Sequence, residues 1–507
     1  MRISLRSLIS FLALFAAMIL LHLPLLRLPY FWDEAGYYIP SALDFYHSWS
    51  LTPYTTLPEG HPPLVMIYLG LAWHLFGFSP LVARAAMTLI AAGTVAALYA
   101  LARRVANREI ALWSTLLLAV SPMFFAQSTL VHLDLAAALF TTLALLFLLN
   151  DRFWLYAVAA SLAVLTKETA VVLLPVAWFY VWQRRRGFAS ERQSSLPPWT
   201  PLLVPLLPLA AWTLYYHHAT GFWLGNRGYL SYNVYSTLSP VRIFWSLLRR
   251  AYELFFSGFN WLLTLCAPVG IWWGRKHAKF DPARLADGPP WRAFILITGG
   301  IVAIYLLLLS VVGGAILPRY LLPVLPVFYL AVIAMLIRLP HLISRPILAV
   351  VALCFVWAWF INPPYPFPFE DNLAYADFIR LHQQSAKFLE SRPGQPRILT
   401  AWPATDELAQ PFLGYVARPL RVVSVQGFAA QDISAVPPES FDLVYLYSRR
   451  WEPPGNWIAR FPAWLRIQGK YFDYRPQADG QDLAARYHLR LVAQMERRGQ
   501  WVEIYAR

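Results

Sequence analysis

The chain has 507 residues, of which 58% are hydrophobic and 14% are charged, and its mean hydropathy is +0.46. A soluble core cannot bury that much apolar surface, so a soluble globular protein is excluded and the sequence predicts a polytopic membrane protein. The formal charge of +15 comes from short basic clusters between apolar runs. That pattern is typical of cytoplasmic loops, and it argues against a nucleic-acid partner.

The apolar runs predict about eleven membrane spans, each close to the length of about 20 residues that a bilayer requires. The first run, residues 8–28, follows basic residues but lacks a small-residue cleavage site, so we interpret it as an uncleaved span. The others are expected at residues 81–101, 110–127, 134–150, 153–166, 169–183, 200–217, 252–273, 292–312, 320–337 and 346–361. The predicted fold class is therefore mainly α, a membrane helix bundle.

Basic residues orient this bundle, because cytoplasmic loops are enriched in Lys and Arg. With the N-terminus in the cytoplasm, every inside connection is basic; these connections carry Arg103, Arg104, Arg108, Arg152, Arg184, Arg185, Arg186, Arg192, Arg275, Lys276, Lys279, Arg338 and Arg345. The predicted location is the plasma membrane, which is the inner membrane of a cell that has two. An odd number of crossings then places the C-terminal segment outside, in the periplasm or the extracellular space.

Polar residues from distant parts of the chain share the outer boundary under this topology. They are Asp33, Glu34, His61, His132, Asp134, Lys167, Glu168 and Arg319. Ionisable groups near hydrocarbon are costly to keep, so they indicate chemistry or ion handling. The adjacent acids of the segment FWDEAGYY, Asp33 and Glu34, are the leading candidates, and the competing interpretation is a pair of solvated loop acids.

Two short apolar segments lie in the first outer loop. Residues 39–50 have helical spacing with aromatic residues and predict an amphipathic helix along the interface. Residues 64–78 follow a Pro-Pro pair and predict a second interfacial or re-entrant helix. A full crossing there would invert all later loops and place the basic ones outside.

The sequence changes character after the proline-rich segment 362–368. Beyond it we expect a helix at residues 372–391, buried strands at 397–402 and 441–448, and a hairpin turning at Arg498 and Gly499. The predicted domains are a membrane domain over residues 1–361 and a small extracytoplasmic α/β domain over residues 362–507. The second domain has no phosphate loop or metal-spaced cluster, so its expected role is acceptor binding, partner docking or a structural cap.

Several motifs occur in a fixed order: FWDEAGYY, HPPL, LARAAMTLIAA, HLDLAAALF, LTKETAVVLLP and PRYLLPVLP. Together with the long first span, they resemble the GT-C superfamily of membrane glycosyltransferases. The likeness is to the bacterial branch related to protein O-mannosyltransferases and lipid A aminoarabinose transferases, and it covers residues 1–340. The resemblance implies transfer of a hexosyl or pentosyl group from a polyprenyl-phosphate-linked sugar to a lipid, glycan or protein acceptor on the outer face, with inversion.

The resemblance also suggests roles for the outer-face residues. Asp33 is expected to be the base that takes the acceptor proton. Glu34 either orients the acceptor, holds Asp33 in place or is itself the base. Developing negative charge on the departing phosphate has to be met by positive groups, for which the candidates are His61, Arg84, Lys167 and Arg319. Further substrate-binding candidates are Tyr37, Glu59, His132, Asp134, Glu168 and Tyr320.

Simpler interpretations stand beside these roles. Lys167 and Glu168 can form a local ion pair, Asp134 can cap a helix, and Arg319 can be an interfacial anchor. No cofactor is expected, although His132 and Asp134 with Asp33 would also suit a divalent cation. The polar outer connection over residues 219–250 either covers the site or lies at the interface without a ligand.

A transporter or lipid flippase is the alternative from another functional class, in which the same charged residues would couple ions or gate a path. Transporters often carry internal repeats. The later spans contain no second copy of the acidic pair or of HPPL, which favours the transferase.

Overall fold

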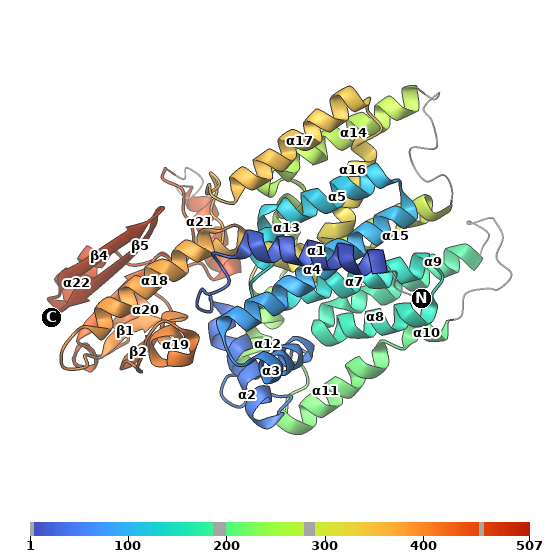
Figure 1. Cartoon of the computed structure of the whole chain (residues 1–507). Helices are drawn as coiled ribbons and strands as arrows, with labels where there is room; N and C mark the ends of the chain where they lie inside the picture. Colours follow the sequence, from blue (N-terminus) through green and yellow to red (C-terminus); the bar gives the residue numbers. More distant parts are fainter. Residues whose placement is uncertain (1–4, 186–198, 278–288, 456–460) are drawn as a thin grey trace.

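The computed structural model describes residues 5–185, 199–277, 289–455 and 461–507. A large helical bundle fills most of the molecule, and a small sheet domain lies against one end of it (Figure 1). Three of the basic residues that oriented the chain, Arg186, Arg192 and Lys279, lie outside the described ranges.

Apolar sequence gives long helices throughout the first 360 residues. In the N-terminal half they are α1 (Leu5–His22), α2 (Ile39–Ser48), α3 (Leu64–Phe76), α4 (Pro80–Val105), α5 (Arg108–Val120), α6 (Pro122–Gln127), α7 (Leu133–Leu149), α8 (Phe153–Thr166) and α9 (Leu173–Arg185). There follow α10 (Thr200–Leu203), α11 (Leu206–Thr220), α12 (Arg227–Asn233), α13 (Pro240–Phe255), α14 (Asn260–Lys276), α15 (Pro289–Val311), α16 (Leu325–Leu336) and α17 (His341–Ala358).

Each predicted span coincides with one of these helices or helix pairs, so the mainly helical membrane fold is confirmed. Among the described residues, five helices are long and apolar enough to cross a membrane unaided: α1, α4, α15, the helix that runs from Pro318 into α16, and α17. The bent pair α13 and α14 would make a sixth, and α3, α7 and α8 are shorter apolar helices. The figure of about eleven crossings stays a prediction.

One predicted span has a different structure. The expected helix over residues 252–273 is two helices, α13 and α14, that meet at a 43° bend. The break falls at Ser257–Phe259, where Gly258 has φ 56° and Phe259 has φ 71°, and these left-handed angles end an α-helix. Helix α13 also begins well before the predicted span, with Pro240 in its first turn.

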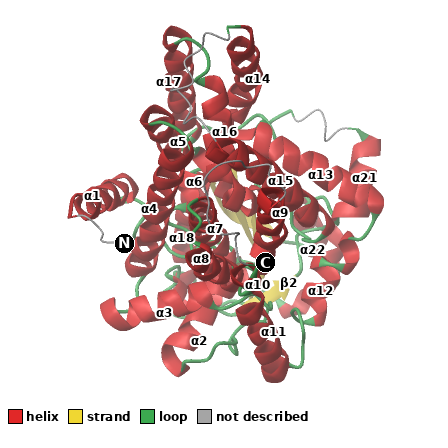
Figure 2. Cartoon of the chain, turned by 90° about the vertical axis from the view of Figure 1, so that its right-hand side faces the viewer, coloured by secondary structure: helices red, strands yellow, loops and turns green. Residues whose placement is uncertain are grey.

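Helix α1 lies along the outside of the bundle, and only Met18 and His22 within it are buried (Figure 2). Both short helices predicted between the first two spans are present, and α2 packs against α3. At Gly70 an added Cβ would lie 2.4 Å from the Phe45 ring, so this close approach requires glycine.

The C-terminal domain contains a five-stranded sheet in the order β2-β1-β3-β5-β4. Strands β1 (Ile398–Ala401), β2 (Val422–Val425) and β3 (Leu443–Tyr447) are parallel, whereas β4 (Arg490–Arg497) and β5 (Gln500–Ala506) form an antiparallel hairpin on β3. The predicted helix, both predicted strands and the hairpin are confirmed, the helix as α18 (Ala374–Glu390). Sequence analysis missed β2 and the helices α19 (Ala404–Ala409), α20 (Ala430–Ser434), α21 (Pro462–Phe472) and α22 (Gly480–Tyr487).

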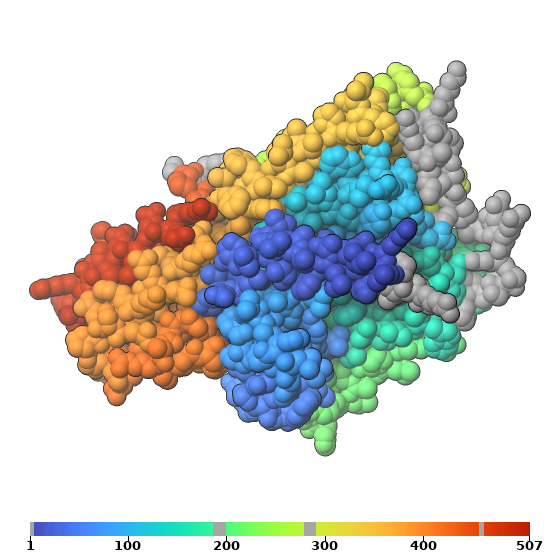
Figure 3. Space-filling model, viewed as in Figure 1, coloured from blue at the N-terminus to red at the C-terminus, as the bar shows by residue number. Residues whose placement is uncertain are grey.

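This domain packs directly on the segment that carries the acidic pair (Figure 3). The Tyr415 hydroxyl donates to the Tyr30 carbonyl at 2.9 Å. The Tyr375 and Thr129 hydroxyls are 2.9 Å apart, which ties α18 to the loop before α7. A Cβ added at Gly36 would lie 2.5 Å from Nε1 of Trp402, so the two chain segments touch there. The boundary after residue 361 stays a prediction, and the two parts share a packed contact.

Candidate active site

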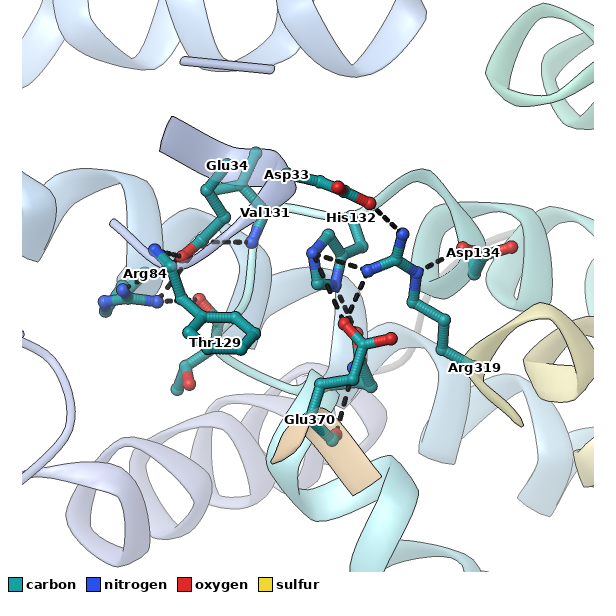
Figure 4. A network of polar contacts seen from close by, with 11 residues as sticks. Asp33, Glu34, Arg84, Thr129, Val131, His132, Asp134, Arg319 and Glu370 are labelled. Atoms are coloured by element: carbon teal, nitrogen blue, oxygen red, sulfur yellow. Dashed lines mark hydrogen bonds and ion pairs between the residues drawn. The ribbon is translucent and has the colours of Figure 1, made fainter. Parts of the chain in front are cut away.

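A tight turn after α1 directs the two acids of the predicted pair to different surroundings (Figure 4). Trp32 has φ 47°, and the amide of Glu34 donates to the Phe31 carbonyl at 2.9 Å. Asp33 then precedes a π-helical turn, η1 (Glu34–Tyr38), an uncommon element that is frequent at functional sites. The side chain of Asp33 is 19% exposed, whereas Glu34 is fully buried.

Glu34 and Arg84 form a buried ion pair behind the turn. The carboxylate accepts from the amides of Phe31 and Val131, both at 2.6 Å, and from Arg84 at 3.2 and 3.3 Å. The guanidinium also donates to the carbonyls of Leu28, Pro29 and Thr129. Both side chains are saturated with protein partners, so in this conformation they fix the turn that presents Asp33.

Arg319 is the centre of the second arrangement, and it is 1% exposed. Its Nη2 donates to Asp33 Oδ2, and its Nη1 donates to Glu370 Oε2 at 2.5 Å. Its Nε lies 3.6 Å from Asp134 Oδ2 (Figure 4). One buried guanidinium thus holds three carboxylates that come from the turn after α1, from α7 and from the C-terminal domain.

His132 belongs to the same network as a neutral imidazole. Its Nδ1 lies 2.6 Å from Gln127 Oε1, an acceptor, so Nδ1 carries the proton and Nε2 accepts from Arg319 at 3.0 Å. Burial, with the positive charge of Arg319, holds the pKa of His132 well below its usual range. The described residues contain no group of three or more His, Cys, Asp or Glu side chains placed to hold a metal ion.

Lys167 extends the network from the start of the 3₁₀ turn η2 (Glu168–Val172). Its Nζ donates to Asp134 Oδ1 at 2.6 Å and lies 4.0 Å from the centre of the Tyr320 ring. Asp134 therefore bridges the two cations Lys167 and Arg319, and its role goes beyond capping α7.

His61 and Glu168 form the most exposed ion pair of the site. Their side chains approach to 3.0 Å and are 13% and 39% exposed. Burial disfavours the charged imidazole, but the Glu168 carboxylate outweighs it and raises the pKa of His61. Lys167 and Glu168 therefore do not pair with each other. Lys167 pairs with Asp134, and Glu168 pairs with His61.

Glu59 and Tyr37 lie beside His61 around a small cavity. Burial raises the pKa of Glu59 to about 7 although the nearby His61 opposes this shift. The Tyr37 ring packs on Trp402 of the C-terminal domain at 5.7 Å. All twelve predicted site residues therefore belong to three neighbouring groups of side chains: the Glu34 and Arg84 pair, the Arg319 network and the His61 cluster.

Sequence reasoning missed Glu370, Gln127 and Trp402. The buried Glu370 sits in η7 (Phe369–Asp371), and its contact with Arg319 joins positions 51 residues apart. The Glu370-Asp371 pair after the proline-rich boundary was a visible signal, since two adjacent acids follow an apolar Pro-Phe run there. Tyr229 belongs to the outer connection over residues 219–250, and its hydroxyl lies 3.5 Å from His61 Nε2.

Comparison with known proteins supports the predicted resemblance. Residues 60–218 match the model of the dolichyl-phosphate-mannose-protein mannosyltransferase family. Two uncharacterised proteins of Aquifex aeolicus (strain VF5) are 31% and 34% identical to this chain over 129 and 134 residues. These matches cover 25% and 24% of this chain and 31% and 27% of the relatives, so the chain matches less than a third of their length.

The similarity of fold extends over the whole chain. The crystal structure of ArnT from Cupriavidus metallidurans bound to undecaprenyl phosphate superposes with a TM-score of 0.56 at 16% identity, covering 98% of this chain and 97% of ArnT. Its apo structure gives a TM-score of 0.53 at 16% identity, with 98% of each chain covered. The family match and the shared architecture confirm the resemblance predicted from the sequence: this chain has the fold of the GT-C membrane glycosyltransferases.

Proposed function

We propose that this protein transfers a monosaccharide from a polyprenyl-phosphate-linked donor to an acceptor at the outer face of the membrane, with inversion and with Asp33 as the base. The observation that carries the proposal is the setting of Asp33. Its partly exposed carboxylate is held by the buried Arg319 on a GT-C fold, and its Oδ1 accepts no hydrogen bond from any residue that the structure describes.

The chemistry is one displacement. The acceptor hydroxyl gives its proton to Asp33 Oδ1 while its oxygen bonds to the anomeric carbon. The bond from that carbon to the phosphate oxygen breaks, and its electron pair leaves with the polyprenyl phosphate. Attack opposite the leaving group inverts the anomeric centre. Arg319 fixes the carboxylate, which reduces the reorganisation that the reaction needs.

The departing phosphate needs positive charge, and each candidate cation already has an acid partner. The pairs are Arg84 with Glu34, Lys167 with Asp134, Arg319 with Asp33 and Glu370, and His61 with Glu168. The cations Arg84, Lys167 and Arg319 are at most 8% exposed, whereas the His61 side chain is 13% exposed, so the His61 and Glu168 pair is the one that a phosphate reaches most easily. We infer that the donor phosphate displaces Glu168 from His61, with Lys167 next to it.

Two comparisons favour a lipid-phosphate donor. The matched family is described as acting with dolichyl-phosphate-mannose, and the ArnT structure holds undecaprenyl phosphate. Both are polyprenyl phosphates or their sugar derivatives. A multi-pass membrane protein fits such a donor, and we place it in the inner or plasma membrane with the C-terminal domain outside.

A turnover assay tests the proposal. The purified protein is incubated in detergent with a panel of polyprenyl-phosphate hexoses and pentoses, with a membrane lipid extract or a Ser/Thr-rich peptide as acceptor. Mass spectrometry should show loss of one lipid-linked sugar and release of its polyprenyl phosphate. In detergent there is no bilayer to transport a lipid across, so a flippase would leave every donor intact. Intact donors across the whole panel would overturn the transferase proposal.

A further inference from the structure

A polar cavity of about 780 Å³ lies between the helical bundle and the C-terminal domain, next to Trp32 in the turn that carries Asp33. Trp32, Tyr232 and Arg249 line it on the bundle side, and residues between Gln426 and Trp501 line it on the other side. The transfer mechanism described above does not use this space. Its lining is rich in charged and amide groups, unlike a groove for a lipid chain.

One arginine of the lining forms no ion pair in the part of the chain that the structure describes. Three of its four arginines face carboxylates within ion-pair distance: Arg249 with Glu253, Arg450 with Glu452, and Arg475 with Asp432 and Asp473. Arg449 has no carboxylate within 4.0 Å in the described part of the chain, and its buried Nε has no hydrogen-bond partner there. A buried Nε without an acceptor is costly, and an anion would satisfy it.

Arg449 is directly connected to the catalytic turn. Its guanidinium carbon lies 5.8 Å from the centre of the Trp32 ring, and Trp32 precedes Asp33 in the chain. Arg449 follows β3 closely, and the amide of Trp501 donates to the neighbouring Ser448 hydroxyl at 3.1 Å, so the sheet fixes its position.

Aromatic faces complete the cavity beside this cation. Tyr232 lies across Gly314, where an added Cβ would be 2.3 Å from its ring, so glycine makes room for it. Trp32 and Trp501 add indole rings, and Gln426 and Gln477 add amides. Aromatic faces with amide groups suit the apolar and hydroxyl faces of a sugar.

We propose that this cavity binds the acceptor, and that the acceptor is a carbohydrate with one anionic substituent, a phosphate or a carboxylate, held by Arg449. The proposal rests on the proposed transferase function and names the substrate class for its acceptor side. The anion pairs with Arg449 while a hydroxyl of the same molecule reaches the Asp33 turn beside Trp32. Arg449 is then a specificity residue and takes no part in the proton transfer.

Calorimetric titration of the purified full chain in detergent tests the proposal with four probes: glucose, glucose 6-phosphate, glucuronate and inorganic phosphate. Both anionic sugars should bind about tenfold or more tightly than glucose, because a charge-assisted hydrogen bond adds that much affinity. Inorganic phosphate should bind more weakly than glucose 6-phosphate, because it lacks the sugar ring. Equal binding of glucose and glucose 6-phosphate, or of phosphate and glucose 6-phosphate, would overturn the proposal.

Two variants and a control locate the effect. Arg449→Gln should remove the preference for anionic sugars, and Arg449→Lys should retain part of it. Arg421→Gln, an exposed arginine of the same domain that lies outside the cavity lining, should leave the preference unchanged. A preference that survives Arg449→Gln would also overturn the proposal. No donor is present in these titrations, so their outcome is independent of the donor panel that tests the transferase function.

Discussion

Arg319 shows how one residue can organise the site. A guanidinium that is 1% exposed is stable only with partners, and it takes Asp33, Glu370 and the imidazole of His132, with Asp134 close by. Two of the acids differ in exposure: Asp33 is 19% exposed, whereas Glu370 is 4% exposed. The exposed acid is the one that can meet a substrate, and the buried one holds Arg319 in place.

The Arg84 and Glu34 pair allows a test of positioning against phosphate binding. Arg84→Met leaves the Glu34 carboxylate buried without its cation, and such a loss costs about 3–5 kcal/mol. We expect a lower melting temperature with an unchanged donor Kd for the folded fraction, measured by thermal unfolding and donor titration. In the double variant with Glu34→Gln, part of the stability should return. A weaker donor Kd at an unchanged melting temperature would instead make Arg84 a phosphate ligand.

Glu59 should make donor binding depend on pH. Its pKa is raised to about 7, so the carboxyl is neutral below that pH and anionic above it, close to the His61 where we place the phosphate. The anion repels the phosphate, so the donor KM should rise from about pH 6 to about pH 8. His61, whose pKa is raised, loses its proton in the same direction. Glu59→Gln should reduce the rise, and an identical KM profile in that variant would contradict the assignment.

At the scale of elements, the turn that carries Asp33 lies between the bundle and the C-terminal domain. Trp402 packs on Trp32 at 5.4 Å between ring centres, and Phe378 of α18 packs on Phe31 at 5.3 Å. The C-terminal domain therefore forms a wall of the site as well as supplying Glu370.

Gly36 is a sensitive point of this contact. A Cβ there would lie 2.5 to 2.9 Å from the Trp402 indole, so Gly36→Ala has to push that side chain away. Overpacking of this kind costs about 1–3 kcal/mol and should shift the Asp33 turn, with a fall in kcat. Trp402→Leu should restore part of the activity in the double variant. Additive losses in a double-mutant cycle would show that the two residues do not act on each other.

The elements show which parts of the fold were predictable. Helices with long apolar runs, such as α4 and α15, and the hairpin around Gly499 follow from local pattern. The break at Gly258 was missed because apolar residues on both sides read as one run. Strand β2 was missed because it is short and only its last residue is buried, so its sequence carries little pattern.

The sequence predicted which residues share the site but not how they pair. Shared outer-face placement grouped Asp33, His132, Lys167 and Arg319, which the structure brings into one network. Which acid pairs with which cation depends on three-dimensional packing. The sequence therefore could not separate the buried Glu34 from the exposed Asp33, or connect Glu370 to Arg319.

At the scale of the molecule, charge divides the bundle into two ends. The basic C-termini of α9 and α14 lie at the end farthest from the sheet domain, and the ion-pair network lies next to that domain (Figure 1). This division is the pattern expected when the sheet domain is outside and the basic end faces the cytoplasm.

Cysteine labelling tests that orientation. In a background of Cys266→Ser and Cys354→Ser, the exposed positions Ser434→Cys and Arg108→Cys report on the two ends. A membrane-impermeant maleimide should label position 434 in intact spheroplasts, and position 108 only after permeabilisation. The reverse pattern would place the sheet domain in the cytoplasm and contradict an outer-face site.

The central claim is that Asp33 takes the acceptor proton, and Asp33→Asn tests it most directly once a donor has been identified. The amide keeps the shape of the side chain but cannot act as the base, so turnover should fall by about 10²-fold or more. Donor Kd should stay close to that of the unchanged protein, and the exposed control Asp482→Asn should keep full turnover. Full activity in Asp33→Asn would contradict the assignment of the base.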